Sequence, residues 1–184
     1  MRHTGLSIFI ALCVILVGSA SWAALPPSES DAYSGQDAPD FSVQTLGGDT
    51  VSLKVYQGHP VLLDFFASWC PPCRQEIADL MQLYGQYAPK GLVIIGAATD
   101  AKLIPETSME KEKKDVESLA ARLQIPWPIT IAQTELVKAY HFKGIPTIVF
   151  ITGEGKIAKV FYGYHNGAQI EKVLQKIMEG NKEK

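Results

Sequence analysis

The part of the sequence best suited to chemistry is the segment Trp69–Cys73, in which two prolines separate Cys70 from Cys73. Two thiols at this spacing can open and close as a disulfide, and a helix start lowers the pKa of the first one. The apolar run 61–67 precedes the pair, and a segment with helical apolar spacing follows it. The pattern predicts redox chemistry, with Cys70 as nucleophile and Cys73 as the resolving thiol.

Metal binding is the main alternative for this pair. The third cysteine, Cys13, lies in the apolar N-terminal stretch, where a packing role explains it. Two thiolates supply only half of a tetrahedral zinc site, and His59, His141 and His165 are scattered without ligand spacing. We therefore expect no metal and no other cofactor. A structural disulfide is also disfavoured, because the loop it would close is too short to stabilise a fold.

Two carboxylates lie where packing alone would not place them. Glu76 follows Cys73 by three residues, so on a helix it lies beside that thiol at the edge of the apolar stripe. Asp64 interrupts the apolar run, and a buried carboxylate destabilises a fold unless it is paired. We expect both to exchange protons with the thiols. The alternatives are an exposed helix glutamate and a hydrogen-bonded strand aspartate, and the sequence leaves open which carboxylate carries the proton.

The hydrophobic pattern predicts a small mixed sheet with helices on both faces. Apolar runs at 61–67 and 92–98 predict two buried strands, joined by a helix over 70–87 into a right-handed parallel βαβ unit. Alternating residues around 46–49 predict an added N-terminal hairpin. Further along we expect a helix over 113–124, a strand at 129–131, a helical turn at 135–140, an antiparallel hairpin from 147–151 and 156–162, and a helix over 169–178.

The N-terminus has the pattern of an export signal. Arg2 and His3 precede an apolar run, and Ser21-Trp22-Ala23 fits a cleavage site with small residues. The alternative is an uncleaved inner-membrane anchor through 6–25 with the domain facing outward. After cleavage the protein would be soluble and periplasmic, or otherwise extracytoplasmic. The expected organisation is a signal peptide over 1–23, a flexible linker over 24–36 and one folded domain over 37–180.

The composition excludes some classes of partner. The 184 residues carry a formal net charge of −2, so no basic surface argues for nucleic acid. The lysines of 111–114 alternate with acidic residues, which indicates a solvated helix face.

Four motifs in order resemble the TlpA/ResA-type branch of the thioredoxin-like proteins, within the AhpC/TSA–redoxin superfamily. They are Ala38–Phe41, Leu62–Cys73, Gly144–Thr147 and Gly153–Lys156. The resemblance implies a thioredoxin-like α/β fold, in which a parallel βαβ half is followed by an antiparallel ββα half. It also implies an exported thiol–disulfide oxidoreductase, in many cases a membrane-tethered reductant.

The resemblance assigns further residues to the site. It implies a cis peptide bond before Pro146, placed opposite the cysteines, so that Ile145, Pro146 and Thr147 bind substrate. Trp69 would offer a partner a flat contact. Glu76 matches a glutamate that ResA-type proteins carry near their thiols. Asp64 departs from the branch, since many members have asparagine there, and instead matches the buried aspartate of thioredoxin.

These expectations lead to one main function and several rivals. The main one is reduction of disulfides in exported proteins. The resemblance implies apocytochrome c or another exported cysteine protein as the substrate, and a membrane-embedded donor as the source of electrons. A periplasmic oxidase or isomerase would use the same pair to form or rearrange disulfides in its partners. A thiol-based copper carrier, a peroxidase of the peroxiredoxin class and a domain with a permanent disulfide are the remaining alternatives. The sequence leaves the direction, the substrate and the oligomeric state open.

Overall fold

The computed structural model describes residues 32–103, 108–140 and 142–180. The expected signal peptide, and most of the expected linker, lie outside these residues. Within the described part of the chain, no helix combines the length and the apolar character that crossing a membrane requires.

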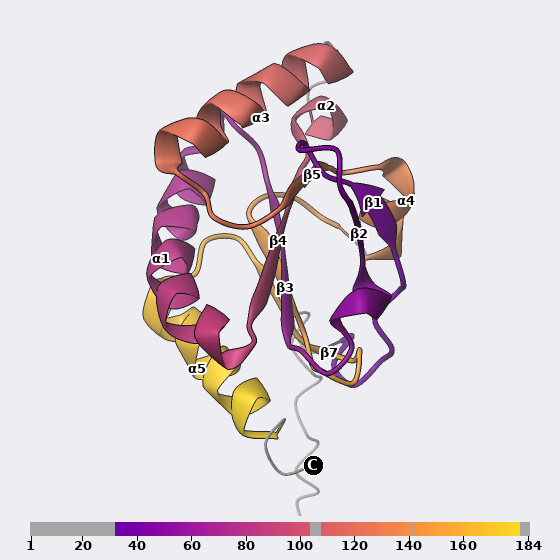
Figure 1. Cartoon of the computed structure of the whole chain (residues 1–184), viewed down its shortest axis with the longest axis vertical. Coiled ribbons are helices and arrows are strands. Elements are labelled where there is room, and N and C mark those ends of the chain that lie inside the picture. Colours follow the sequence, from indigo (N-terminus) through magenta and orange to yellow (C-terminus); the bar gives the residue numbers. More distant parts are fainter. Residues whose placement is uncertain (1–31, 104–107, 141, 181–184) are drawn as a thin grey trace, which may run out of the picture.

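A five-stranded mixed sheet forms the centre of the molecule, in the order β5-β4-β3-β6-β7 (Figure 1). The pairs β3–β4 and β4–β5 are parallel, whereas β3–β6 and β6–β7 are antiparallel. The predicted change from a parallel half to an antiparallel half is therefore confirmed. The strands are β3 (Val61–Phe66), β4 (Val93–Ala98), β5 (Ile129–Ile131), β6 (Thr147–Ile151) and β7 (Ile157–Tyr162).

Strand β3 is buried on both faces, as its nearly continuous apolar sequence predicts. Because side chains alternate along a strand, Leu62, Asp64 and Phe66 point to one face. Leu62 and Phe66 belong to the larger apolar cluster. Leu63 and Phe65 belong to the cluster on the other face. Asp64 is thus the one charged side chain of β3, and it lies on the side of the larger cluster.

Each face of the sheet has its own cover. Three helices cover one face and contribute residues to the larger cluster: α1 (Pro71–Tyr87), α3 (Met109–Leu123) and α5 (Gly167–Gly180). The other face is covered by α4 (Thr134–Ala139) and by the hairpin of β1 (Ser42–Gln44) and β2 (Thr50–Ser52) (Figure 1). Helices on both faces and an antiparallel N-terminal hairpin are therefore confirmed.

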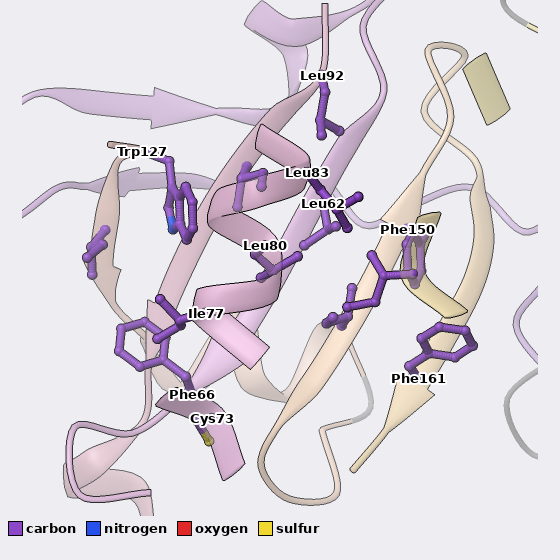
Figure 2. Packing of buried hydrophobic residues seen from close by; sticks show 14 of the residues in the cluster. Leu62, Phe66, Cys73, Ile77, Leu80, Leu83, Leu92, Trp127, Phe150 and Phe161 are labelled. Carbon is purple, nitrogen blue, oxygen red and sulfur yellow. The ribbon is translucent and has the colours of Figure 1, made fainter. Parts of the chain in front are cut away.

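Helix α1 begins directly after Cys70, which is its N-cap, and two prolines occupy its first turn. Proline suits this position because its missing N–H would have no partner within the helix. Ile77, Leu80 and Leu83 then recur at helical spacing and pack in the larger cluster (Figure 2). Cys73 lies on the same apolar face that packs α1 against the sheet, so its side chain is buried.

Two boundaries differ from the predicted ones by more than two residues. Helix α3 begins at Met109 and not at Lys113. The Ser108 side chain accepts the Lys111 N–H and caps the helix there, one turn before the start that the apolar spacing predicts. Residues 33–36, within the expected linker, are bonded to β7: the Gly35 N–H donates to the Ile157 carbonyl at 2.7 Å. The short helix α2 (Asp100–Leu103) and the 3₁₀ turns η2 (Leu53–Tyr56) and η3 (Ala88–Lys90) were not predicted.

Candidate active site

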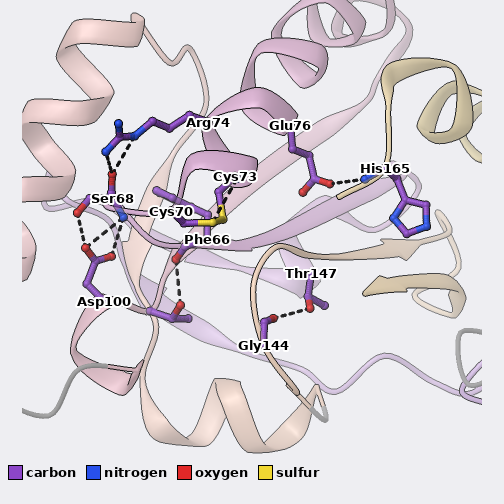
Figure 3. Close-up of a disulfide and its surroundings, with 11 residues drawn as sticks. Phe66, Ser68, Cys70, Cys73, Arg74, Glu76, Asp100, Gly144, Thr147 and His165 are labelled. Carbon is purple, nitrogen blue, oxygen red and sulfur yellow. Dashed lines mark hydrogen bonds between the residues drawn. A yellow bond between two sulfur atoms is a disulfide. The ribbon is translucent and has the colours of Figure 1, made fainter. Parts of the chain in front are cut away.

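The two cysteines form a disulfide at the carboxyl end of β3, with an S–S length of 2.07 Å and a Cα–Cα distance of 5.3 Å (Figure 3). Both are buried, Cys70 at 3% exposure and Cys73 at 1%. The Cys73 N–H donates to the Cys70 sulfur at 3.2 Å. A backbone donor and a helix N-terminus stabilise negative charge, so after reduction this position favours the Cys70 thiolate.

An exposed rim surrounds the buried disulfide. Trp69 is 43% exposed, although it is large and apolar, and Pro71 and Pro72 are exposed as well. A partner therefore meets the Trp69 ring and the two prolines before it reaches sulfur. The contact role expected for Trp69 stays a prediction.

The loop before β6 lies at the same edge of the sheet as the disulfide. The Ile145–Pro146 peptide bond is cis, as predicted. Thr147 pairs with Phe65, near the end of β3 from which Cys70 follows, and its hydroxyl donates to the Gly144 carbonyl at 2.7 Å. Ile145 is half-buried, while Pro146 and Thr147 are buried. The structure thus brings the three expected substrate-binding residues to the edge that carries the cysteines.

Glu76 is buried on α1, one turn after Cys73, with only 1% of its surface exposed. One of its oxygens accepts the His165 backbone N–H at 3.2 Å (Figure 3). The other has no hydrogen-bond partner among the described residues. Burial raises the pKa of Glu76 well above its ordinary value, and the nearby Asp64 carboxylate raises it further. The alternative of an exposed helix glutamate is therefore wrong.

Asp64 is also buried at 1% exposure, and neither of its oxygens has a hydrogen-bond partner within the part of the chain that the structure describes. Burial raises the pKa of this carboxyl group. The alternative of a hydrogen-bonded strand residue therefore finds no support. Since ionised Asp64 and Glu76 repel each other in a buried setting, the pair retains a proton near neutral pH.

A third group of polar residues holds the segment before Cys70. The buried Asp100 carboxylate accepts the N–H and the hydroxyl of Ser68, and the Arg74 guanidinium donates to the Ser68 carbonyl (Figure 3). The Arg74 side chain is exposed, but its two bonds of 3.1 and 2.7 Å tie it to the backbone.

Neighbouring residues complete the surroundings of the site. His165, on the loop after β7, is half-buried and stacks on Phe161 with ring centroids 3.8 Å apart. The Tyr164 hydroxyl accepts from Gln75 and donates to Asp79, both at 3.0 Å. These contacts join the loop after β7 to the outer face of α1.

A model of the AhpC/TSA family matches residues 34–160, which is more than half of the chain. The chain belongs to the AhpC/TSA family. Among its relatives is the thioredoxin-like protein YneN of Bacillus subtilis, 32% identical over 166 residues, or 89% of this chain and 93% of that protein. The thiol-disulfide oxidoreductase ResA of Halalkalibacterium halodurans is 29% identical over 92% of this chain and 89% of its own length.

Solved structures agree with this family assignment. A putative thiol:disulfide interchange protein DsbE from Chlorobium tepidum superposes with a TM-score of 0.68 and 27% identity, over 79% of this chain and 97% of the other. A thiol:disulfide interchange protein from Bacteroides sp. gives 0.64 and 26%, over 78% and 90%. The predicted thioredoxin-like fold and the predicted class, a thiol–disulfide oxidoreductase with the Cys70–Cys73 pair, are confirmed.

Trp127 is buried in the core, edge-on to Tyr84. His59 is exposed, whereas His141 lies outside the described residues. Within the residues that the structure describes, no three His, Cys, Asp or Glu side chains gather in a way that could hold a metal ion. The described site therefore offers no observation in favour of the copper-carrier alternative.

Proposed function

We propose that this protein reduces disulfides in exported proteins through the Cys70–Cys73 pair. The Cys70 thiolate attacks one sulfur of the partner's disulfide, forms a mixed disulfide and releases the partner's other sulfur as a thiolate. Cys73 then attacks the Cys70 sulfur, which frees the second partner thiol and leaves the 70–73 disulfide. A dithiol donor returns two electrons and two protons to restore the reduced pair.

The observation that carries this proposal is the pairing of the disulfide with two buried carboxyl groups. Cys73 must lose its proton before it can attack, and it is almost completely buried. Glu76 is one helical turn away, and Asp64 is on the strand face beneath α1. Raised pKa values keep these groups able to accept and return a proton near neutral pH. A permanent disulfide would need neither group.

The partner and the compartment rest on other grounds. The segment 1–23 has the sequence pattern of an export signal, and the alternative is a tether through 6–25. Relatives carry the names thiol-disulfide oxidoreductase ResA and DsbE. These names support thiol–disulfide exchange as the reaction. The resemblance to exported reductants supports apocytochrome c as one substrate and a membrane-embedded donor as the source of electrons.

Trapping the mixed disulfide tests the cycle. The probe is an oxidised peptide with a Cys-x-x-Cys-His disulfide, mixed with the reduced protein fragment that begins after Ala23. We expect the native pair to reduce the peptide and Cys73→Ser to stop at a covalent adduct, because the resolving thiol is missing. Cys70→Ser should give neither product. Adduct formation by Cys70→Ser would overturn the assigned roles.

The pH dependence of peptide reduction tests the carboxyl groups. We expect Asp64→Asn and Glu76→Gln each to slow the reaction about tenfold near neutral pH and to change the shape of the pH profile, because a proton acceptor for Cys73 is lost. The exposed Glu117 on α3 provides the matched control, Glu117→Gln, whose profile should equal that of the native protein. Unchanged profiles in both site variants would refute the proton role.

A further inference from the structure

Asp100 is a buried charge that the proposed cycle does not use. It is 1% exposed and is the first residue of α2, with one residue between it and the end of β4. The preceding residue fixes this position against β3, because the N–H and the hydroxyl of Thr99 donate to the Phe66 carbonyl at 2.8 and 3.0 Å. The Asp100 carboxylate is thereby held beside the segment that leads from β3 to Cys70.

Ser68 has every polar group of its backbone and side chain engaged. Its N–H donates to the two Asp100 oxygens at 3.1 and 3.0 Å, and its hydroxyl donates to one of them. Its carbonyl accepts from Nε and Nη2 of Arg74 at 3.1 and 2.7 Å. The donor side of this residue thus faces a negative charge and the acceptor side faces a positive one, as Figure 3 shows.

We propose that Ser68, Asp100 and Arg74, here called the Ser68 clamp, position the Trp69–Cys70 segment and set the reactivity of Cys70 through two opposed charges. Ser68 is two residues before Cys70. Arg74 is one helical turn after it, and its N–H donates to the Cys70 carbonyl at 3.3 Å. The Arg74 charge favours the Cys70 thiolate, whereas the Asp100 charge disfavours it. The inference depends on the proposed function only in that Cys70 is the attacking thiol.

Other titratable groups lie on the elements around Cys70, and the test must hold them constant. They come from α1, β3 and the loop after β7, and they are Cys73, Glu76, Asp64 and His165. Apart from Cys73, which a common background removes, each stays in place in every variant compared. Differences between variants therefore report the Ser68 clamp.

The experiment measures how fast iodoacetamide alkylates Cys70 as a function of pH. All proteins begin after Ala23 and carry Cys73→Ser, so that one thiol remains. We expect Asp100→Asn to move the midpoint of the profile about half a pH unit lower and Arg74→Gln to move it about half a unit higher. Below the midpoint, these shifts change the rate about threefold in opposite directions. Arg74→Lys, which keeps the charge, should restore most of the native midpoint.

Two matched controls remove charges elsewhere. Asp115 and Arg122 lie on α3, outside the site. Asp115→Asn and Arg122→Gln change the net charge by the same amounts as the two site variants, so they should leave the midpoint of the alkylation profile unchanged.

A neutral variant separates position from charge. Ser68→Ala keeps both charges and removes the hydroxyl donor, so the alkylation midpoint should stay unchanged. In the protein with both cysteines, the same variant should reduce the peptide disulfide about threefold more slowly, because the segment is held less firmly. Ser118→Ala, on the exposed face of α3, is its control and should reduce the peptide at the native rate.

The outcomes distinguish this inference from the proposed function. If Cys70 does not react in the parent protein, the proposed function fails. If it reacts but both charge variants keep the native midpoint, or shift it in one direction, the clamp proposal is overturned. A purely structural role would lower the melting temperature without shifting the midpoint. Should Asp100→Asn fail to fold, the exposed Arg74 decides alone, and an unchanged midpoint in Arg74→Gln overturns the proposal.

Discussion

At the scale of single residues, the unusual feature is a pair of buried carboxyl groups beneath one disulfide. Asp64 has no hydrogen-bond partner among the described residues, and Glu76 has one backbone donor. Burying an ionised carboxylate without partners destabilises a fold, so both groups favour their protonated forms. The loss of folding stability at these two positions is consistent with a role in proton exchange with the thiols.

The free energy of unfolding should fall as pH rises. In the unfolded chain both groups ionise near pH 4, but burial raises their pKa in the folded protein. Their favourable contribution is complete below about pH 4 and is lost as pH rises through the raised values. For the oxidised protein we expect Asp64→Asn to raise the unfolding free energy at pH 8 by about 2 kcal/mol, with little gain at pH 4.

Denaturant unfolding at pH 4, 6 and 8 measures this effect. Asp115→Asn, which removes a half-buried carboxylate paired with Lys111 on α3, should keep the native pH dependence. If the unfolding free energy changes equally with pH in Asp64→Asn and in the native protein, Asp64 ionises in the folded state without loss of stability, which contradicts this prediction.

At the scale of elements, the site depends on close packing where β3, β4 and β5 meet. Asp64 pairs with Gly96 of β4, and side chains fill the space above this glycine. A Cβ at Gly96 would lie 3.1 Å from Cε1 of Phe66 and 3.2 Å from Cγ1 of Ile129. Glycine therefore lets the aromatic ring of β3 lie against its neighbouring strands.

Filling this space should destabilise the protein. We expect Gly96→Ala to lower the unfolding free energy by about 1–3 kcal/mol, because the buried Phe66 ring and Ile129 must move. Gly85 is the matched control: it is exposed on α1, and a Cβ there meets nothing within 4 Å. Gly85→Ala should therefore stabilise by up to about 1 kcal/mol. Equal effects of the two changes in thermal unfolding would contradict this packing.

Strong patterns in the sequence predicted most of the elements. The run Val61–Phe66 could be recognised because a central strand is apolar on both faces, and α1 because its apolar residues recur at helical spacing. Helix α2 was missed because four residues carry no periodic signal. The contacts of Arg74 and His165 were missed because they involve backbone atoms, which no side-chain pattern reveals.

At the scale of the whole molecule, residues before position 37 extend the fold at its sheet edge. Strand β7 is at one end of the sheet, and residues 33–36 lie against it. The Ile157 N–H donates to the Gln36 carbonyl at 2.9 Å, and the Ser34 hydroxyl donates to the Ala158 carbonyl at 3.0 Å. A covered edge strand is less prone to pair with another chain.

Truncation tests the importance of this segment. A fragment that begins at Asp37 loses these bonds and the one from Gly35, so we expect it to be about 2 kcal/mol less stable than a fragment that begins at Ala24. Denaturant unfolding of the two fragments gives the comparison. Equal stability would place the domain boundary at residue 37, as the sequence alone predicts.

The direction of electron flow is the central claim, and the reduction potential of the Cys70–Cys73 couple tests it most directly. The measurement equilibrates the fragment that begins after Ala23 with glutathione or dithiothreitol buffers of known potential. A reductant that needs an electron donor should give a value below about −230 mV. A value above about −150 mV would make the protein an oxidant and would contradict the proposed function.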